Sequence, residues 1–254
     1  MKNVRTKKRK YTQRTLNKKN LIKKLSNETA NELLNNAKKY ESKIIELVQS
    51  LEDKKRKIFL TPNWKDTLFK SKESLSRKIN KRLKSEIKKN KDKTNQDIQK
   101  RAQKIKNKIT DYIRVTYIIP QKIYEKKILS LIDKLRQNNC IQLKPCKKQL
   151  RWELGDYYQG TNTVWQCPLQ KSKIEVQFHT TESLKMKEKI HKKYEIHRVN
   201  CINNNGGIIK NRKCKTLRKQ MLTMEKSVII PKGLDVKKRF IRFDKNGKAY
   251  LSTE

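Results

Sequence analysis

An excess of positive charge is the strongest constraint on how this chain can fold. Its 254 residues hold 67 lysines and arginines against 24 aspartates and glutamates, a formal net charge of +43. Charge of this size destabilises a compact monomer through self-repulsion. A polyanion relieves the repulsion, so we expect a nucleic acid partner, RNA more than DNA, with an anionic membrane surface as the second candidate. The alternatives are an AT-rich genome, which enriches lysine, asparagine and isoleucine, and charge runs that are simply solvated.

The apolar residues limit the size of the core and the environments in which the protein can occur. They make up 34% of the chain and are clustered, which allows one domain with extensions or two small domains. No apolar run approaches the length of a membrane span. Residues 1–15, "MKNVRTKKRKYTQRT", are basic but lack the apolar segment of a secretory signal. We therefore expect an intracellular protein, cytoplasmic or associated with a virion or organelle.

The cysteines predict free thiols in a reducing compartment. Their number is odd and no two form a CxxC pair, so the spacing matches neither a zinc site nor a disulfide framework. The five are Cys140, Cys146, Cys167, Cys201 and Cys214.

The two ends of the chain are basic extensions in this interpretation. Residues 1–20 contain no acidic side chain and are expected to form a disordered arm, followed by one or two amphipathic helices over 20–57. Near the other end we expect a basic helix over 212–226 and a hairpin that turns at Asn246-Gly247. The predicted segments are thus 1–55, 56–200 and 201–254.

The middle of the chain alternates between helical and strand patterns. "TDYIRVTYIIP" (110–120) indicates a buried strand that ends at its proline, and residues 121–139 give the clearest helix. A short strand at 140–146 is followed by strands at 163–166 and 172–180, which we expect to pair as a hairpin before a helix over 182–198. This order predicts an α+β fold with a small mixed β-sheet flanked by helices.

Two carboxylates stand out because acidic residues are scarce. In "IEVQFHT" the side chains of Glu175, Gln177 and His179 share one face of the predicted strand. Asp111 opens the strand that ends at Pro120. Carboxylates at the mouths of neighbouring strands suit a divalent metal and phosphoryl chemistry. The alternative is that each is an ion-pair partner in a basic chain.

A basic cluster precedes the first of these strands. At a helix start such a cluster can hold a triphosphate, although an ordinary basic helix face has the same composition. It consists of Lys70, Lys72, Arg77 and Lys78 with Ser74 and Ser76. Aromatic residues around Gly155 and Gly160 either stack on a base or close the end of a small core. These are Trp152, Tyr157, Tyr158 and Trp165.

Taken in order, these motifs resemble the synthetase domain of RelA/SpoT proteins. The family's RxKxxxS stretch is similar to Lys70-Ser-Lys72 followed by Ser76, and its strand-opening aspartate is matched by Asp111 in "DYIRVT". "QGTNTVW" occupies the place of NGYRSLH, "EVQFHT" that of EIQIRT, and "KEKIHKKYEIHR" that of a downstream AExGxxAHWxYK-like helix. The resemblance covers about residues 65–200. Its style is nearest to RelA/SpoT-like domains of phage minor-head proteins and toxins.

The resemblance implies a magnesium-dependent pyrophosphokinase or nucleotidyltransferase. Magnesium is expected on Asp111 and Glu175, and a pyrophosphoryl group is expected to pass from ATP to the 3′-hydroxyl of a nucleotide or RNA. The implied catalytic residues are Glu175, Gln177 and Asp111. The implied ATP-binding residues are Lys70, Lys72, Ser76, Lys78, Arg114 and His179.

Departures from the family motifs fall on the acceptor side. Thr161, Asn162 and Trp165 replace the family's tyrosine, arginine and histidine, and His179 replaces the arginine of the last motif. The acceptor site is therefore not that of a guanosine alarmone synthetase. Two interpretations stay open: an enzyme with an unusual acceptor, or a catalytically retired domain that acts as a structural nucleic-acid-binding protein of a virion or ribonucleoprotein.

Overall fold

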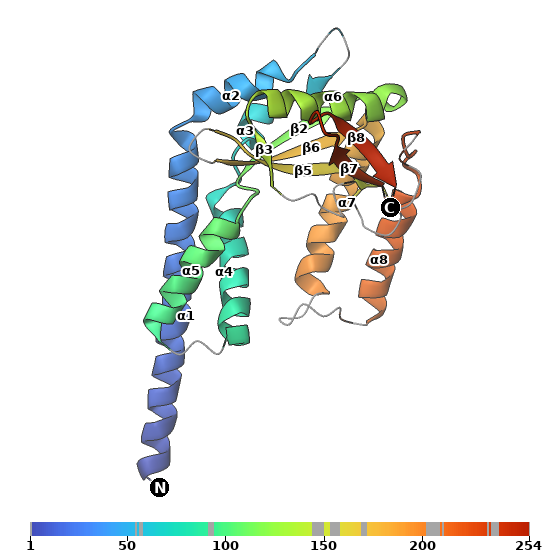
Figure 1. Ribbon diagram of the computed structural model, residues 1–254. Helices are drawn as coiled ribbons and strands as arrows, with labels where there is room; N and C mark the ends of the chain where they lie inside the picture. Colours follow the sequence, from blue (N-terminus) through green and yellow to red (C-terminus); the bar gives the residue numbers. More distant parts are fainter. Residues whose placement is uncertain are drawn as a thin grey trace. The chain divides into compact units, whose positions relative to one another are not determined.

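The computed structural model divides the chain into two compact units, which are described separately (Figure 1). The first consists of Met1–Lys43 and Lys65–Ile113, and the second of Ile44–Trp64 and Arg114–Glu254. Each unit joins two stretches of chain, so neither coincides with one of the predicted segments. The structure describes residues 2–53, 55, 58–90, 94–143, 150–152, 158–168, 172–201, 209, 211–232, 234 and 239–253.

The first unit is helical. Helices α1 (Lys2–Lys38), α4 (Lys72–Asn90) and α5 (Asn95–Lys108) pack against one another. The short α3 (Trp64–Thr67) crosses the boundary at which the second stretch begins. Helix α5 begins with a capping box, in which the Thr94 side chain and Asp97 satisfy each other's backbone N–H groups. The apolar side chains recur at helical spacing and are buried between the helices. On α4 and α5 they are Leu75, Ile79, Leu83, Ile87, Ile98, Ala102 and Ile105.

The predicted disordered arm at residues 1–20 is wrong, because α1 runs without a break from Lys2 to Lys38. Lysine and arginine are good helix formers, and the absence of acidic residues does not by itself prevent a helix. Once Ile22, Ala30 and Leu33 are buried against α4 and α5, the helix extends in both directions from this anchored part. The second amphipathic helix expected before residue 57 is α2 (Glu41–Ser50).

The second unit contains the mixed sheet that the sequence predicts. The strand order is β1-β2-β6-β5-β3, and β4 also pairs with β5. Strands β5 and β6 form the expected antiparallel hairpin, with Asn162 opposite Gln177. The contacts between β2 and β6 ascend together along both strands, from Arg114 with Glu175 to Ile119 with His179, so these two strands are parallel. The strands are β1 (Phe59–Leu60), β2 (Ile113–Ile118), β3 (Ile141–Gln142), β4 (Leu150–Arg151), β5 (Gly160–Gln166) and β6 (Lys173–His179).

Helices lie on both sides of this sheet. A 3-10 turn, η1 (Gln121–Ile123), leads into α6 (Tyr124–Gln137), which lies with α2 on one side of the sheet, whereas α7 (Thr181–Asn200) lies on the other (Figure 1). On the first side, the Tyr124 hydroxyl donates to the carbonyl of Phe178 at 2.6 Å and the Tyr117 hydroxyl to that of Val48 at 2.6 Å. A capping box of Thr180 and Ser183 begins α7 directly after β6.

The C-terminal part of the second unit follows the prediction. Helix α8 (Arg212–Glu225) packs against α7, and β7 (Arg239–Phe243) pairs with β8 (Ala249–Thr253) as a hairpin. Gly247 adopts φ +78 in the turn, a conformation that favours glycine. The hairpin docks on α6: Arg136 lies 4.1 Å from the ring centre of Phe243 and donates to the Gly247 carbonyl, and the Ala249 N–H donates to Asp133 at 2.8 Å.

The cysteines correct one expectation and leave another open. Cys201 and Cys214 form a disulfide that joins the end of α7 to α8, so the prediction of free thiols is wrong for these two. Their pairing depends on the antiparallel packing of two helices, which residue spacing does not reveal. Cys140 and Cys167 are free, whereas Cys146 lies outside the described residues. The disulfide gives no support to the predicted reducing compartment. No helix in the described part of the chain is long and apolar enough to cross a membrane.

Reduction of the Cys201–Cys214 disulfide should destabilise the protein. The bond closes a loop with a sequence separation of 13 residues, and a loop of this size restricts the unfolded chain by about 3 kcal/mol. Urea unfolding of the oxidised protein with and without reductant measures the difference. The Cys201→Ala/Cys214→Ala variant is the control, because reductant should leave its midpoint unchanged. Equal midpoints for the oxidised and reduced natural chain would contradict the expectation.

Candidate functional site

In the first unit, Asp111 binds two of the predicted phosphate-binding lysines. Its Oδ2 atom lies 2.8 Å from Lys70 Nζ and 2.6 Å from Lys78 Nζ. Backbone contacts hold this arrangement, since the Lys70 N–H donates to the Tyr112 carbonyl at 3.0 Å and Phe69 forms a β-bridge with Ile113. Asp111 therefore lies two residues before β2, close to the strand start that the sequence predicts, and Lys78 reaches it from α4.

Burial and charge act in opposite directions on this cluster. Burial alone raises the pKa of Asp111, but the ammonium groups of Lys78 and Lys70 outweigh it and hold that pKa below its usual value. Burial lowers the pKa of Lys78, with help from Lys70 and Arg82, although Asp111 opposes the shift. At neutral pH Asp111 is thus a carboxylate paired with two lysine side chains, and ammonium groups of this kind can also contact phosphate oxygens.

Two other predicted ATP-binding residues lie apart from this ion-pair cluster. Lys72 is exposed at the first position of α4. The Ser76 hydroxyl donates to Asn27 Oδ1 on α1, so it links two helices within the first unit. The structure thus brings Lys70 and Lys78 together with Asp111, whereas Lys72 is exposed and Ser76 contacts α1.

In the second unit, Glu175 is the centre of a buried polar network. Its Oε2 atom accepts a hydrogen bond from Arg114 Nε at 3.1 Å. Its Oε1 atom accepts from Asn162 Nδ2 at 2.6 Å and from Gln177 Nε2 at 3.0 Å. Both carboxylate oxygens therefore have donors from the protein, and a metal ion on Glu175 would have to replace one of them.

Gln177 extends the network to the helix that covers this face. Its Oε1 atom accepts from Lys187 Nζ on α7 at 2.6 Å and from the Thr116 hydroxyl at 3.3 Å. Burial lowers the pKa of Lys187 to about 8, assisted by Arg114 and opposed by Glu175 and Glu188. The row formed by Glu175 and Gln177 is thus not a solvated strand face: both side chains are buried, with 6% and 3% of their surface exposed.

Sequence reasoning missed the contributions of Thr116, Asn162 and Lys187 to this network. The hairpin register places Asn162 opposite Gln177 on the same face, a signal available once β5 and β6 are paired. The parallel register of β2 with β6 likewise places Thr116 near Gln177. Lys187 could not be found in this way, because its position depends on how α7 crosses the sheet.

His179 lies at the end of the row in a closed position. Its Nδ1 atom is 3.0 Å from Ser183 Oγ, and its Nε2 atom is 3.0 Å from the Tyr158 hydroxyl. Burial, together with the nearby Lys187, lowers the pKa of His179 well below its usual value, although the backbone of Gln159 opposes the shift. A neutral imidazole brings no positive charge to a phosphate, so the predicted ATP-binding role of His179 finds no electrostatic support.

The aromatic residues near this loop belong to the core where they are described. Trp165 and Trp152 are buried, and Trp152 makes an edge-to-face contact with Tyr124 at 5.1 Å between ring centres. Tyr158 contacts His179 edge to face, also at 5.1 Å. Tyr157 lies outside the described residues. Of the two interpretations, closing a small core fits Trp152 and Trp165.

The predicted magnesium ligands belong to different units, Asp111 to the first and Glu175 to the second. A shared metal site on these two carboxylates stays a prediction. No protein-family model and no curated protein sequence matches this chain. The RelA/SpoT resemblance therefore rests on the quoted motifs alone.

Lys187 should report on the charge of Glu175. Glu175→Gln removes a negative charge that raises the pKa of Lys187, so we expect that pKa to fall below about 8. The pH dependence of Lys187 acetylation, followed by peptide mass spectrometry, measures it. Glu182→Gln is the control, because Glu182 is exposed in the first turn of α7. An unchanged midpoint in Glu175→Gln would refute the coupling.

The lowered pKa of Lys187 also predicts how the free energy of unfolding changes with pH. The pKa of Lys187 lies below the ordinary 10.5 in the folded state, so the folded chain releases this proton first. The unfolded state then binds more protons between pH about 8 and 10.5, and Lys187 makes the free energy of unfolding rise with pH in this window. Lys187→Met should remove that contribution.

Gly160→Ala should disturb the packing around His179. A Cβ at Gly160 would lie 2.6 Å from His179 Cε1 and 3.0 Å from the Phe178 carbonyl oxygen. Overpacking of this kind costs about 1–3 kcal/mol. Urea unfolding in the natural and the His179→Ala backgrounds tests the cause, because the loss should be smaller when the ring is absent. An equal loss in both backgrounds would point to strain elsewhere.

Proposed function

We propose that this protein is a magnesium-dependent pyrophosphokinase that uses ATP as the donor. The observation that carries the proposal is the cluster of Asp111 with Lys70 and Lys78. Two amines can neutralise phosphate charge, and the carboxylate between them can bind the magnesium ion that accompanies ATP. The order of motifs that resembles RelA/SpoT synthetases supports the same assignment.

The proposed reaction transfers the β- and γ-phosphates of ATP together. The 3′-oxygen of the acceptor attacks the β-phosphorus and loses its proton, the bond from that phosphorus to the bridging α–β oxygen breaks, and AMP leaves. Lys70 and Lys78 stabilise the charge on the transferred phosphates by position and electrostatics. Magnesium, when bound to Asp111, would supply further charge neutralisation.

The acceptor is a nucleotide or the end of an RNA. The high positive charge of the chain favours RNA, because phosphate contacts dominate the affinity for nucleic acids. Asn162 stands where the family has arginine, which is consistent with an acceptor other than a guanosine nucleotide.

The second candidate function is a structural nucleic-acid-binding protein with a retired active site. The hydrogen bonding of Glu175 favours it, since both carboxylate oxygens already accept bonds from Arg114, Asn162 and Gln177. A neutral, enclosed His179 in the last motif points in the same direction. Both candidates predict salt-sensitive binding to nucleic acid, so magnesium-dependent ATP binding and transfer are the measurements that separate them.

A transfer assay with ATP labelled at the α- or γ-phosphate should identify the reaction. We expect the γ-label to move to an acceptor and the α-label to appear in AMP in equal amount. GDP, GTP, ADP, ATP and total tRNA are the acceptors to test, with magnesium present. Release of ADP would indicate single phosphoryl transfer, and release of pyrophosphate would indicate nucleotidyl transfer.

Matched variants separate the enzyme from a contaminant. Asp111→Asn and Lys78→Met should each abolish transfer, because they remove the proposed metal ligand and a phosphate-binding cation. Glu182→Gln and Lys81→Met, at exposed positions of α7 and α4, should retain it. No transfer to any acceptor by a folded natural chain that still binds RNA would overturn the proposal in favour of the structural candidate.

A further inference from the structure

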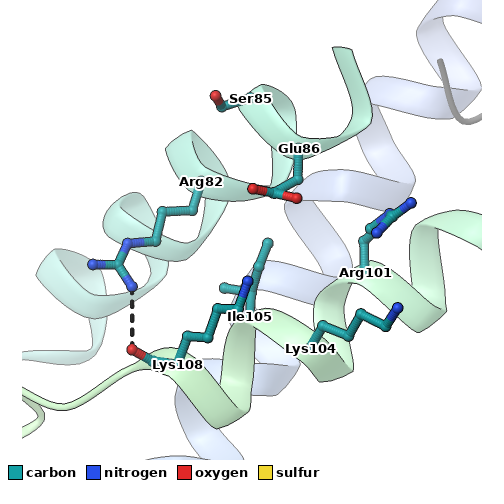
Figure 2. Close-up of a pocket in the computed structure, with 7 residues that line it drawn as sticks. All are labelled: Arg82, Ser85, Glu86, Arg101, Lys104, Ile105 and Lys108. Carbon is teal, nitrogen blue, oxygen red and sulfur yellow. Dashed lines mark hydrogen bonds between the residues drawn. The ribbon is translucent and has the colours of Figure 1, made fainter. Parts of the chain in front are cut away.

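The first unit contains a pocket between α4 and α5 that the proposed reaction does not use. It has a volume of about 250 Å³. Figure 2 shows side chains from both helices directed around it, with Arg82 and Lys108 at one end and Arg101 and Lys104 at the other. The lining residues are Arg82, Ser85, Glu86, Arg101, Lys104, Ile105 and Lys108.

The chemistry of the lining favours an anion. Four of the seven residues are basic, one is acidic, and Ile105 is the only apolar side chain among them. Sites for small organic molecules are lined mainly by apolar and aromatic residues, which this pocket lacks. The lining also lacks the aromatic anchors that are typical of an interfacial membrane-binding helix. The lining thus matches the phosphate groups of a polyanion.

Arg82 retains donors for such a group. Its Nη1 atom donates to the Lys108 carbonyl at 3.4 Å, which ties α4 to the end of α5. A guanidinium group has five N–H donors, so several stay available for a phosphate oxygen. The exposed residues Ser85 and Lys104 line the same pocket.

The fold itself concentrates basic residues around this groove. The apolar residues of α4 and α5 are buried between the helices of the first unit, so the charged ones occupy the outer faces. Together the two helices carry thirteen lysines and arginines against three acidic residues. This surplus is not cancelled within the two helices and creates a positive potential that attracts polyanions.

We propose that the α4–α5 pocket binds the phosphodiester backbone of a nucleic acid. Arg82 contacts a phosphate at one end of the pocket, and Arg101 with Lys104 contacts the neighbouring phosphate at the other end. RNA and DNA present the same phosphodiester, so we expect the pocket to bind either nucleic acid. It adds to the nucleic-acid contacts expected from the extensions 1–55 and 201–254. The proposal does not rest on pyrophosphate transfer, because its test measures binding.

The test compares two variants of the full chain that lose the same charge. The pocket variant is Arg82→Gln/Arg101→Gln/Lys104→Gln. The control variant is Lys122→Gln/Lys126→Gln/Lys189→Gln, at exposed positions of the second unit. Binding to a 20-nucleotide single-stranded RNA and to DNA of the same sequence is measured by fluorescence anisotropy over a range of salt. Polyglutamate serves as an acidic polypeptide probe.

We expect the pocket variant to bind both RNA and DNA more weakly than the control variant. The slope of log affinity against log salt should fall by about 0.7 for each lost phosphate contact with a single strand. Ser85→Glu, which adds a negative charge and removes no basic residue, should also weaken binding. This second variant keeps the test decisive if the triple variant does not fold.

Three results would overturn the proposal. Equal losses in the pocket and control variants would show that binding follows overall charge. Unchanged binding in both the folded triple variant and Ser85→Glu would show that the pocket takes no backbone phosphate. A loss confined to polyglutamate would assign the pocket to an acidic protein.

Discussion

The second unit depends on the parallel pairing of β2 with β6. These strands come from distant parts of the chain, and their pairing joins β1 and β2 to the hairpin of β5 and β6 in one sheet. The Ile119 N–H donates to the His179 carbonyl at 2.8 Å where both strands end. The same register brings Arg114 to Glu175 and Thr116 to Gln177, so the polar network exists only because this pairing forms.

Scarce carboxylates are placed where they organise the surplus of positive charge. Asp111 holds two lysines beside the start of β2, Glu175 orients Arg114 on the sheet, and Asp133 binds the C-terminal hairpin to α6. On α4 and α5, basic side chains outnumber acidic ones, although Lys78 pairs with Asp111 and Lys106 with Glu32. The internal polar contacts are thus specific, and the proposed polyanion would contact the outer surfaces, where the surplus charge lies.

Much of the fold could be predicted from periodicity, and the failures have physical causes. The alternation in "IEVQFHT" and the Asn246-Gly247 turn located β6 and the last hairpin, because these signals are local. The length of α1 and the Cys201–Cys214 bond were missed, since both depend on packing between helices distant in sequence. In the candidate site, the structure pairs Asp111 with Lys70, two residues that the sequence had singled out, whereas Lys187 joins the Glu175 network only because of how α7 crosses the sheet.

The docking of the last hairpin on α6 has a consequence for the order of folding. Its contacts join residues 111 and 116 positions apart in sequence, through Arg136 with Gly247 and Asp133 with Ala249. Contacts this distant form slowly, because a long loop must close before they stabilise the chain. During synthesis, α6 can complete its packing on the sheet long before the hairpin leaves the ribosome. Until the final strands are synthesised, the outer face of α6, with Asp133 and Arg136, stays in contact with water.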